Sequence, residues 1–204
     1  GTDGKTTTTM ITAALLRGGG RSVGEVGNTD LPFMAAIDQP FDAFVVECSS
    51  FRLQFTDAFR CDASVWLNLA PDHLDWHGSL ESYTEAKRRL WAYSRTSDVV
   101  IAPVSNEMIL ESARATPARC VTFGLDAGDY KVSSGSLVSP HGVICSIDEL
   151  WRALPHDITN SLAAAALVIE SGLSVAGQVA APLHHFESAL HRIELVGHFD
   201  GSAW

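Results

Sequence analysis

Cysteine is scarce in this sequence, and its cysteines are not spaced as a zinc site or a disulfide framework. They are scattered, with no Cys-x-x-Cys pair: Cys48, Cys61, Cys120 and Cys145. This distribution is typical of the reduced thiols of a cytoplasmic protein. The sequence also lacks any apolar run approaching the roughly 20 residues that cross a bilayer. We therefore expect no membrane partner.

Positive charge is scarce as well. The 204 residues include 14 lysines and arginines against 24 aspartates and glutamates, which gives a formal net charge of −10. Such a field repels the phosphates of nucleic acids, so we expect no nucleic-acid partner. The net negative charge also opposes nucleotide binding. Nucleotide phosphates would therefore have to be bound by local backbone amides, a lysine and metal ions. A hydrophobic content of 46% indicates a folded globular domain.

The chain begins with most of a phosphate-binding loop. Gly1 to Thr7 read Gly-Thr-Asp-Gly-Lys-Thr-Thr, and backbone N–H groups of such a loop bind phosphate at a helix N-terminus. Lys5 is predicted to reach the β- and γ-phosphates and Thr6 to bind Mg²⁺. A glycine-rich turn before a helix is the alternative. A P-loop normally follows a buried parallel strand, so we expect this chain to be a piece of a longer protein.

The pattern that follows the loop alternates between helices and short apolar strands. We expect strands at residues 43–46, 63–69 and 98–102, and helices at residues 5–16, 31–37, 80–93 and 106–115. This alternation predicts an α/β fold, a P-loop-type doubly wound and mainly parallel sheet.

The second half of the chain changes character. Residues 120–147 contain short β-prone pieces separated by Gly, Ser and Pro, which predict an antiparallel meander extending the main sheet. Helices are expected at 160–170 and 175–183. Residues 191–196 and 202–204 are interpreted as the first strands of a further domain. We therefore divide the chain into a central ATP-binding domain (1–189), truncated at its N-terminus, and the start of a C-terminal domain (190–204).

Polar residues follow two of the predicted strands. Glu47 ends the run Phe44-Val45-Val46, at the carboxyl edge where ligands bind in open α/β sheets. It is a candidate Mg²⁺ ligand, or else a solvent-facing strand end. Residues 67–75 deliver Asp72, His73 and Asp75 to the same edge. His73 is a candidate second metal ligand, although a lone loop histidine is often only a surface residue.

Lys87 falls on the apolar stripe of the helix predicted at residues 80–93. It lies four residues after Tyr83 and three before Leu90, whereas Arg88 and Arg89 lie off the stripe. An inward lysine must pair with a carboxylate, reach water or lose its proton. A neutral amine reacts with CO₂ to form a carbamate, an anionic metal ligand. The residues alone leave the ion pair and the carbamate equally open.

Motifs along the whole chain match the pattern of one family. They are GTDGKTT (1–7), GNTDLP (27–32), ECSSFRL (47–53), DHLD (72–75) with AK (86–87), HDITN (156–160) with AAA (163–165), and HRIE (191–194). Together they resemble the Mur ligase family, the ATP-dependent amide ligases of peptidoglycan precursor synthesis. Phe51 follows the Ser-Ser pair, where the siblings that add diaminopimelate or lysine tend to have histidine. This favours the member that adds D-glutamate.

The resemblance implies an activity. ATP would phosphorylate the carboxylate of UDP-N-acetylmuramoyl-L-alanine, and the amine of D-glutamate would attack the acyl phosphate. We accordingly expect a cytoplasmic, monomeric enzyme with these two small-molecule substrates. The present chain alone is predicted not to make product. Three rivals remain: a sibling ligase such as the diaminopimelate/lysine-adding enzyme or folylpolyglutamate synthase, a non-catalytic ATP-binding module, and a relic that binds nothing.

The resemblance also implies roles for single residues. The catalytic residues would be Lys5, His73 and Lys87. ATP would be bound by Gly1, Thr2, Asp3, Gly4, Lys5, Thr6, Thr7, Asn160 and Arg192. The other substrates would be bound by Asn28 and Ser49. Two Mg²⁺ ions are implied, the first held by Thr6 and Glu47 and the second by His73 and a carbamylated Lys87.

Some assignments carry alternatives or departures from the family pattern. Asn160 would face adenine, but it is equally natural as a helix N-cap, and both roles are compatible. Asp3 and Asp157 stand where the family usually has asparagine. A carboxylate only accepts hydrogen bonds, so Asp157 puts the adenine contact there in doubt.

Overall fold

The computed structural model describes residues 1–29, 31–187, 198–199 and 202–203. Its α-helices are α1 (Lys5–Gly18), α2 (Phe33–Ala36), α3 (Ser50–Gln54), α4 (Leu74–His77), α5 (Leu80–Arg88), α6 (Glu107–Arg114), α7 (Pro155–Glu170) and α8 (Ala180–His184). Its strands are β1 (Val23–Gly27), β2 (Ala43–Glu47), β3 (Ala63–Val65), β4 (Val99–Pro103), β5 (Arg119–Phe123), β6 (Lys131–Ser133), β7 (Ser136–Ser139), β8 (Gly142–Ser146), β9 (His198–Phe199) and β10 (Ser202–Ala203).

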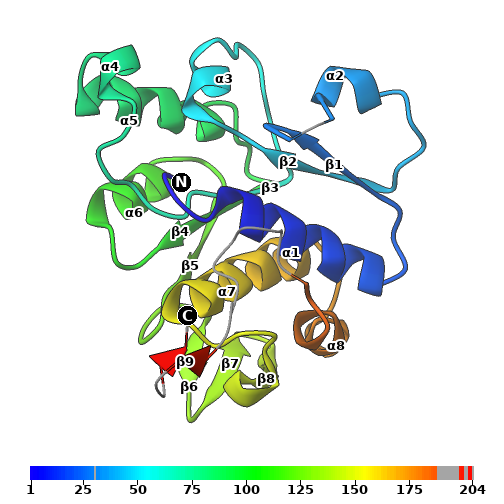
Figure 1. Cartoon of the computed structure of the whole chain (residues 1–204). Helices are drawn as coiled ribbons and strands as arrows, with labels where there is room; N and C mark the ends of the chain where they lie inside the picture. Colours follow the sequence, from blue (N-terminus) through cyan, green and yellow to red (C-terminus); the bar gives the residue numbers. More distant parts are fainter. Residues whose placement is uncertain (30, 188–197, 200–201, 204) are drawn as a thin grey trace.

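The parallel strands form two sheets, β1-β2 and β3-β4-β5, with β4 between its neighbours. Alternate residues of β4 enter different hydrophobic clusters. Val99 and Ile101 pack with α1 and α7, whereas Val100 and Ala102 pack with α6 and Trp91. Successive side chains of a strand point to opposite faces, so helices cover both faces of this sheet. The predicted doubly wound α/β fold is confirmed (Figure 1).

Helices α1 and α7 pack against each other and lie side by side in Figure 1. The contact is close because α7 presents four consecutive alanines, residues 163–166, that are entirely buried. In α1, Ile11 and Leu15 are likewise inaccessible. Fixing these two helices together holds the start of α1, and with it the preceding glycine-rich loop, rigidly against the core.

Strand β1 is absent from the sequence predictions, because Gly24 and Gly27 weaken its strand propensity. The structure explains why both are glycine. A Cβ on Gly24 would lie 2.8 Å from a ring carbon of Phe41. Gly27 has φ of 102°, and a Cβ there would lie 2.4 Å from the carbonyl oxygen of Glu47. The close approach of β1 to β2 therefore requires Gly24 and Gly27. The same two glycines make β1 difficult to recognise as a strand from the sequence.

The predicted meander is partly wrong. Residues 119–123 form β5, which pairs in parallel with β4 and belongs to the main sheet. The antiparallel meander consists of β6, β7 and β8 alone. It stays attached to the main sheet through a bridge between Phe123 and Tyr130. An apolar strand after a helix, such as 119–123, continues the parallel sheet when the helix can cross over it.

Several predicted boundaries also need correction. The predicted helix 80–93 continues after α5 only as a 3₁₀ turn, Arg89–Trp91, and the predicted helix 175–183 is a 3₁₀ turn, Ala176–Gln178, followed by α8. The predicted strand 63–69 is paired as β3 only to Val65. Helices α3 and α4 are absent from the predictions. The predicted strand 191–196 lies outside the described residues. Within the described part, no helix is long and apolar enough to cross a membrane.

Candidate nucleotide-binding site

The glycine-rich loop has the backbone of a phosphate-binding loop. Gly4 adopts a left-handed conformation with φ of 78°, and α1 begins at the next residue. Lys5 Nζ donates to the carbonyl oxygen of Thr2 at 2.6 Å, so the lysine folds back over the loop. Thr6 and Thr7 lie half-buried in the first turn of α1, whereas the next two threonines are buried. The first turn of the helix therefore presents N–H groups, an ammonium group and hydroxyls together.

A residue that the sequence reasoning missed holds this loop in place. The backbone N–H of Asp3 donates to Asn68 Oδ1 at 2.9 Å, and Asn68 Nδ2 donates to the carbonyl oxygen of Asp3 at 3.1 Å. The N–H of Thr2 also donates to the carbonyl oxygen of Asn68. Asn68 follows β3 and is remote in sequence from the loop. These bonds fix the loop at the carboxyl end of β3.

Asn160, in α7, supports the same phosphate-binding loop. The structure corrects its predicted alternative as an N-cap, because α7 begins at Pro155, whose fixed φ suits the first helical position. Asn160 is buried inside the helix, and its Oδ1 accepts from the Thr8 hydroxyl at 3.3 Å. A Cβ on Gly4 would lie only 2.6 Å from that oxygen. Position 4 therefore has room for nothing larger than glycine.

Asp157, one turn earlier, is occupied by an ion pair. Arg152 Nε and Nη2 donate to its two carboxylate oxygens at 2.5 and 2.9 Å, and Asp157 is fully buried. The carboxylate is therefore satisfied by this chain. Asp157 therefore does not provide the amide group that asparagine provides at this position in the family pattern.

Glu47 ends β2 and is 4% exposed. Its Oε1 accepts from Asn28 Nδ2 at 3.2 Å, which brings two predicted site residues together. Its Oε2 is buried without a hydrogen-bond partner among the described residues. A buried carboxylate oxygen without a partner is costly. The geometry therefore suits a cation or donor that is supplied by a ligand.

Lys87 is 5% exposed on α5, as the helical periodicity predicts. Its Nζ lies 4.3 Å from the centre of the Tyr83 ring. Within the described residues no carboxylate lies within 4.0 Å of that nitrogen, so the predicted ion pair is not found there. Burial, and then the charge of Lys5, lower the pKa of Lys87 to about 8. At neutral pH the amine is then mostly protonated, with a neutral fraction on the order of one-tenth, far more than for an ordinary lysine.

Tyr83 connects this lysine to the phosphate-binding loop. Its ring lies beneath the Lys87 amine, and its hydroxyl lies 3.2 Å from the Thr2 hydroxyl. Thr2 Oγ1 in turn accepts from the N–H of Ala70 at 3.0 Å. Sequence reasoning assigned Tyr83 only to the apolar stripe. Its hydroxyl is the feature that reaches the site.

His73 lies beside Tyr83 but is more exposed to solvent than Lys87. It has a left-handed backbone with φ of 52°, and its side chain is 45% exposed. The ring packs on Phe51, with centroids 4.7 Å apart, and Nε2 lies 3.3 Å from Asp72 Oδ2. The Tyr83 ring lies 6.4 Å away. His73 is thus close to Lys87 through Tyr83, on the solvent side.

The remaining predicted residues are less central. Ser49 is the N-cap of α3, and its hydroxyl accepts from the N–H of Arg52 at 3.4 Å. A nearby histidine, His77, lies 3.1 Å from the Ser50 hydroxyl. Burial, then the charges of His73 and Lys87, lower the pKa of His77. Arg192 lies outside the described residues.

Four predicted residues share one groove of about 750 Å³. Lys5, Glu47 and Lys87 all line it, together with Gly1. No group of three His, Cys, Asp or Glu side chains in the described part of the chain could hold a metal. The predicted first metal site, however, combines Glu47 with a hydroxyl and nucleotide oxygens. Oxygen donors of this kind suit Mg²⁺, and the unpartnered Glu47 Oε2 fits that role.

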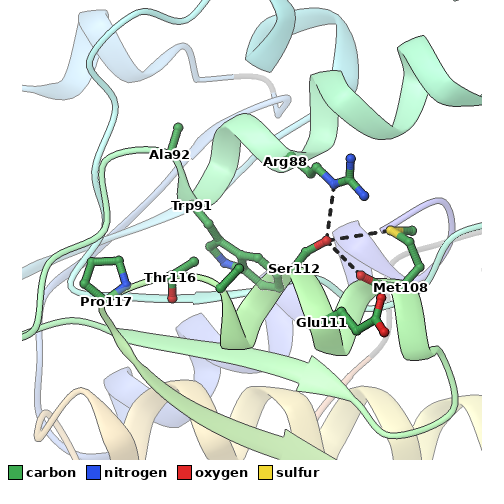
Figure 2. A pocket seen from close by; sticks show the side chains of 9 residues that line it. Arg88, Trp91, Ala92, Met108, Glu111, Ser112, Thr116 and Pro117 are labelled. Carbon is green, nitrogen blue, oxygen red and sulfur yellow. Dashed lines mark hydrogen bonds between the residues drawn. The ribbon is translucent and has the colours of Figure 1, made fainter.

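A second hollow, of about 460 Å³, lies between α6 and the end of α5 (Figure 2). Arg88 Nε donates to the Ser112 hydroxyl at 3.2 Å, and Ser112 donates to the carbonyl oxygen of Met108 at 2.7 Å. No sequence-predicted site residue lines this hollow. The chemistry-bearing residues of the chain are therefore gathered elsewhere.

The fold and the loop define a P-loop nucleotide-binding domain of the α/β class. The comparisons with known proteins specify it further: a sequence model of the Mur ligase middle domain matches residues 1–168. The chain belongs to the Mur ligase family.

Curated relatives agree with this assignment. The chain is 36% identical over 214 residues to the UDP-N-acetylmuramoylalanine--D-glutamate ligase of Frankia casuarinae, a match covering 100% of the chain and 45% of the relative. The protein of the same name from Mycolicibacterium smegmatis is 37% identical over 208 residues, covering 98% and 41%. The chain thus spans less than half the length of these relatives.

Solved structures share the fold. MurF from Acinetobacter baumannii superposes with a TM-score of 0.75 at 19% identity, covering 97% of this chain and 47% of that protein. E. coli FolC in complex with DHPP and ADP gives a TM-score of 0.65 at 20% identity, covering 90% and 55%. At such identities the likeness concerns the fold alone.

Proposed function

We propose that this chain is the ATP-binding part of a ligase that joins D-glutamate to UDP-N-acetylmuramoyl-L-alanine. The observation that carries the proposal is a buried carboxylate and a buried amine beside the phosphate-binding loop, neither of which forms an ion pair among the described residues. Glu47 Oε2 lacks a hydrogen-bond partner and Lys87 lacks a carboxylate among the described residues, and both line the groove that Lys5 also lines. The relatives named for this reaction support the choice of substrates.

In this proposal the loop binds the phosphates of ATP. The backbone N–H groups at the start of α1 and the helix dipole attract the phosphates. Lys5 leaves the carbonyl oxygen of Thr2 and stabilises the charge on the γ-phosphoryl group as it moves to the substrate carboxylate. The acyl phosphate is then attacked by the amine of D-glutamate. Phosphate leaves as the amide forms.

Thr6 and Glu47 are the proposed ligands of a first Mg²⁺, and His73 and Lys87 those of a second. Bound magnesium neutralises phosphate charge during the transfer. For Lys87 we propose carbamylation, in which the neutral amine forms an N–C bond with CO₂ and releases a proton to solvent. The lowered pKa of Lys87, about 8, and the absence of a carboxylate partner in the described residues support this modification.

The other predicted residues take positions around this centre. Asn28 orients Glu47 through their hydrogen bond and lies toward the incoming carboxylate substrate. Ser49 lies at the same carboxyl edge of the sheet as Glu47. Asn160 supports the phosphate-binding loop on the side where we propose that adenine binds. Arg192 reaches the phosphates from the domain that begins near residue 190. We propose that the whole enzyme is a monomer, and we place it in the cytoplasm because the scattered cysteines fit a reducing compartment.

The test uses the full-length protein with ATP, Mg²⁺ and UDP-N-acetylmuramoyl-L-alanine. D-Glutamate, diaminopimelate, lysine and L-glutamate are added separately, and phosphate release and product mass are measured. We expect release with D-glutamate only. Release with diaminopimelate or lysine would assign a sibling reaction, and ATP binding without product under any condition would assign a non-catalytic module. The 204-residue chain alone is expected to give no product.

A further inference from the structure

An exposed tryptophan lies beside the candidate site. Trp76 of α4 is 56% exposed. Exposure alone is ordinary for a single apolar side chain on a protein surface. Trp76 is unusual instead in how firmly its ring is held and in which ring it contacts.

The indole ring of Trp76 is held by two side chains of α3. Its Nε1 donates to Gln54 Oε1 at 3.1 Å. Its ring meets the ring of Phe51 edge-on, with centroids 5.5 Å apart and planes at 65°. These two contacts fix the orientation of a side chain that solvent still reaches. Such a ring loses little conformational freedom when a ligand binds to it, so it is preorganised for binding.

The short helix that carries Trp76 is fixed as well. Its last residue, His77, has Nε2 at 3.1 Å from Ser50 Oγ, at the start of α3. The His77 ring packs on Tyr83 of α5, with centroids 5.2 Å apart. Both α3 and α4 contact α5 (Figure 1). Because Lys87 also belongs to α5, Trp76 is held in a fixed position relative to this lysine.

Phe51 joins Trp76 to His73. The Phe51 ring contacts both side chains, with its centroid 4.7 Å from the His73 ring and 5.5 Å from the Trp76 ring. Trp76 therefore lies two ring contacts from a proposed ligand of the second Mg²⁺. His73 and Trp76 are both exposed, so this is the solvent side of the centre. On the other side, the Tyr83 hydroxyl reaches the phosphate-binding loop at Thr2.

The length of the proposed acceptor substrate matches this arrangement. Its reacting carboxylate belongs to the alanyl unit, and a lactyl unit joins that alanine to the sugar ring. Together the two units are about as long as two residues of extended chain, or ~7 Å. With ATP on the side of the loop, the rest of the substrate extends from the centre toward solvent. The sugar ring then comes level with Trp76, whereas the uracil lies beyond the diphosphate.

The chemistry of the two rings is complementary. The face of an aromatic ring carries negative charge density, and indole offers the largest such face among the side chains. The C–H groups on one face of a pyranose ring are slightly positive and apolar. A sugar ring can therefore lie flat on the exposed indole while its hydroxyl groups remain in water.

We propose that Trp76 is a specificity-determining residue whose indole face binds the N-acetylated pyranose ring of the acceptor substrate. This inference rests on the proposed function for the identity of that substrate. Phe51 supports the indole and connects the sugar subsite to His73. The sugar takes no part in the bond changes, so this contact is equally strong in the ground state and the transition state. It contributes to KM and not to kcat.

The experiment measures binding and turnover in the full-length protein. Three ligands are titrated by calorimetry: UDP-N-acetylmuramoyl-L-alanine, N-acetylmuramoyl-L-alanine without the nucleotide, and UDP alone. Trp76→Leu removes the ring, and Trp76→Phe keeps a smaller one. Tyr93→Leu is the matched control, because Tyr93 is also an exposed aromatic residue but has no ring contact with Phe51 in the described part of the chain.

We expect Trp76→Leu to weaken binding of both sugar ligands by about tenfold and to raise the KM for the full substrate by a similar factor. Its kcat, its melting temperature and its affinity for UDP should not change. Trp76→Phe should recover most of the affinity. Tyr93→Leu should bind all three ligands as the wild type does.

Three results would overturn the proposal. Unchanged affinity of Trp76→Leu for both sugar ligands would show that the indole does not touch the sugar. An equal loss of affinity for UDP would assign Trp76 to the uracil. A fall in kcat with unchanged KM would make Trp76 a structural residue.

The outcome also separates this proposal from the proposed function. Binding of N-acetylmuramoyl-L-alanine that depends on Trp76, without product from D-glutamate, would reject the reaction and keep the sugar subsite. Product formation with an unchanged KM in Trp76→Leu would reject the subsite and keep the reaction. Failure of the wild type to bind either sugar ligand would overturn both.

Discussion

Two buried ions in this molecule have opposite surroundings. Asp98 precedes β4 and is 1% exposed. It accepts from Arg60, from the N–H of Arg95 and from the Ser97 hydroxyl. Its pKa falls to about 2, chiefly because of the Arg60 hydrogen bonds. Lys87 is also buried, at 5% exposed, yet its amine faces the ring of Tyr83 and has no carboxylate partner among the described residues.

The contrast separates structural charge from functional charge. Removing one partner of a buried, hydrogen-bonded ion pair destabilises the fold, whereas a buried ion that has no partner costs stability and persists only where another benefit offsets the cost. Glu47 repeats the second pattern through its unpartnered Oε2. Asp157, paired with Arg152, repeats the first. The unpartnered ions mark the candidate site more sharply than any single motif.

Replacement of Lys87 should have the largest effect: a loss of activity without a loss of stability. We expect Lys87→Met to lower ligase turnover in the full-length protein by on the order of 10³-fold, as for loss of a group that stabilises the transition state. The melting temperature should rise, because a buried ammonium group is removed. Turnover and thermal unfolding are measured on the same preparation. Activity near the wild-type level would exclude the carbamate.

Replacement of Asp98 should lower stability and leave the affinity for ATP unchanged. Asp98→Ala leaves Arg60 and the N–H of Arg95 without their acceptor, and we expect a loss of about 2–3 kcal/mol in the free energy of unfolding. Urea denaturation of the 204-residue chain measures it. In the full-length protein, the affinity for ATP should not change once the protein is folded. Equal stability of the variant and the wild type would contradict the structural role.

The same aspartate should make stability depend on pH. Its folded-state pKa, about 2, lies below the ordinary value of 3.8, so its contribution is complete above about pH 4. That contribution should be lost as the pH falls toward about 2, because the unfolded state binds the proton first. Urea denaturation across this range, for wild type and Asp98→Asn, isolates the effect by difference. Parallel curves for the two proteins would argue against it.

The link through Tyr83 should give the smallest effect. Tyr83→Phe keeps the ring beneath Lys87 but removes the hydroxyl that reaches Thr2. We expect the ATP affinity of the full-length protein to fall by about 0.5–1.5 kcal/mol, the net value of one hydrogen bond. Tyr83→Leu, which also removes the ring beneath Lys87, should in addition lower turnover. Identical affinity of Tyr83→Phe and wild type would remove Tyr83 from the site.

The parts of the site that follow local rules were predictable from sequence. The loop and α1 follow from Gly4, Lys5 and the apolar spacing after them, and the 3.6-residue period places Lys87 inward. Glu47 stands at a strand end because its run of apolar residues stops there. In each case the information lies within a few residues of the feature.

The parts that depend on distant contacts were not predictable. The bonds between Asn68 and Asp3 join segments 65 residues apart, and nothing beside Asn68 signals them. Strand β1 was missed because its glycines serve contacts with β2 that no local pattern records. The assignment of residues 119–123 to the meander failed similarly, since strand partners depend on the path of the intervening helix.

The most direct test of the contrast is calorimetric titration of ATP into the full-length protein and its Glu47→Gln variant, with and without Mg²⁺. Glutamine keeps a carbonyl oxygen for Asn28 but removes the negative charge. We predict that Mg²⁺ tightens ATP binding to the wild type by about tenfold or more, or ~1.4 kcal/mol, and that this gain disappears in the variant while its melting temperature does not fall. An undiminished Mg²⁺ effect in Glu47→Gln would contradict the account.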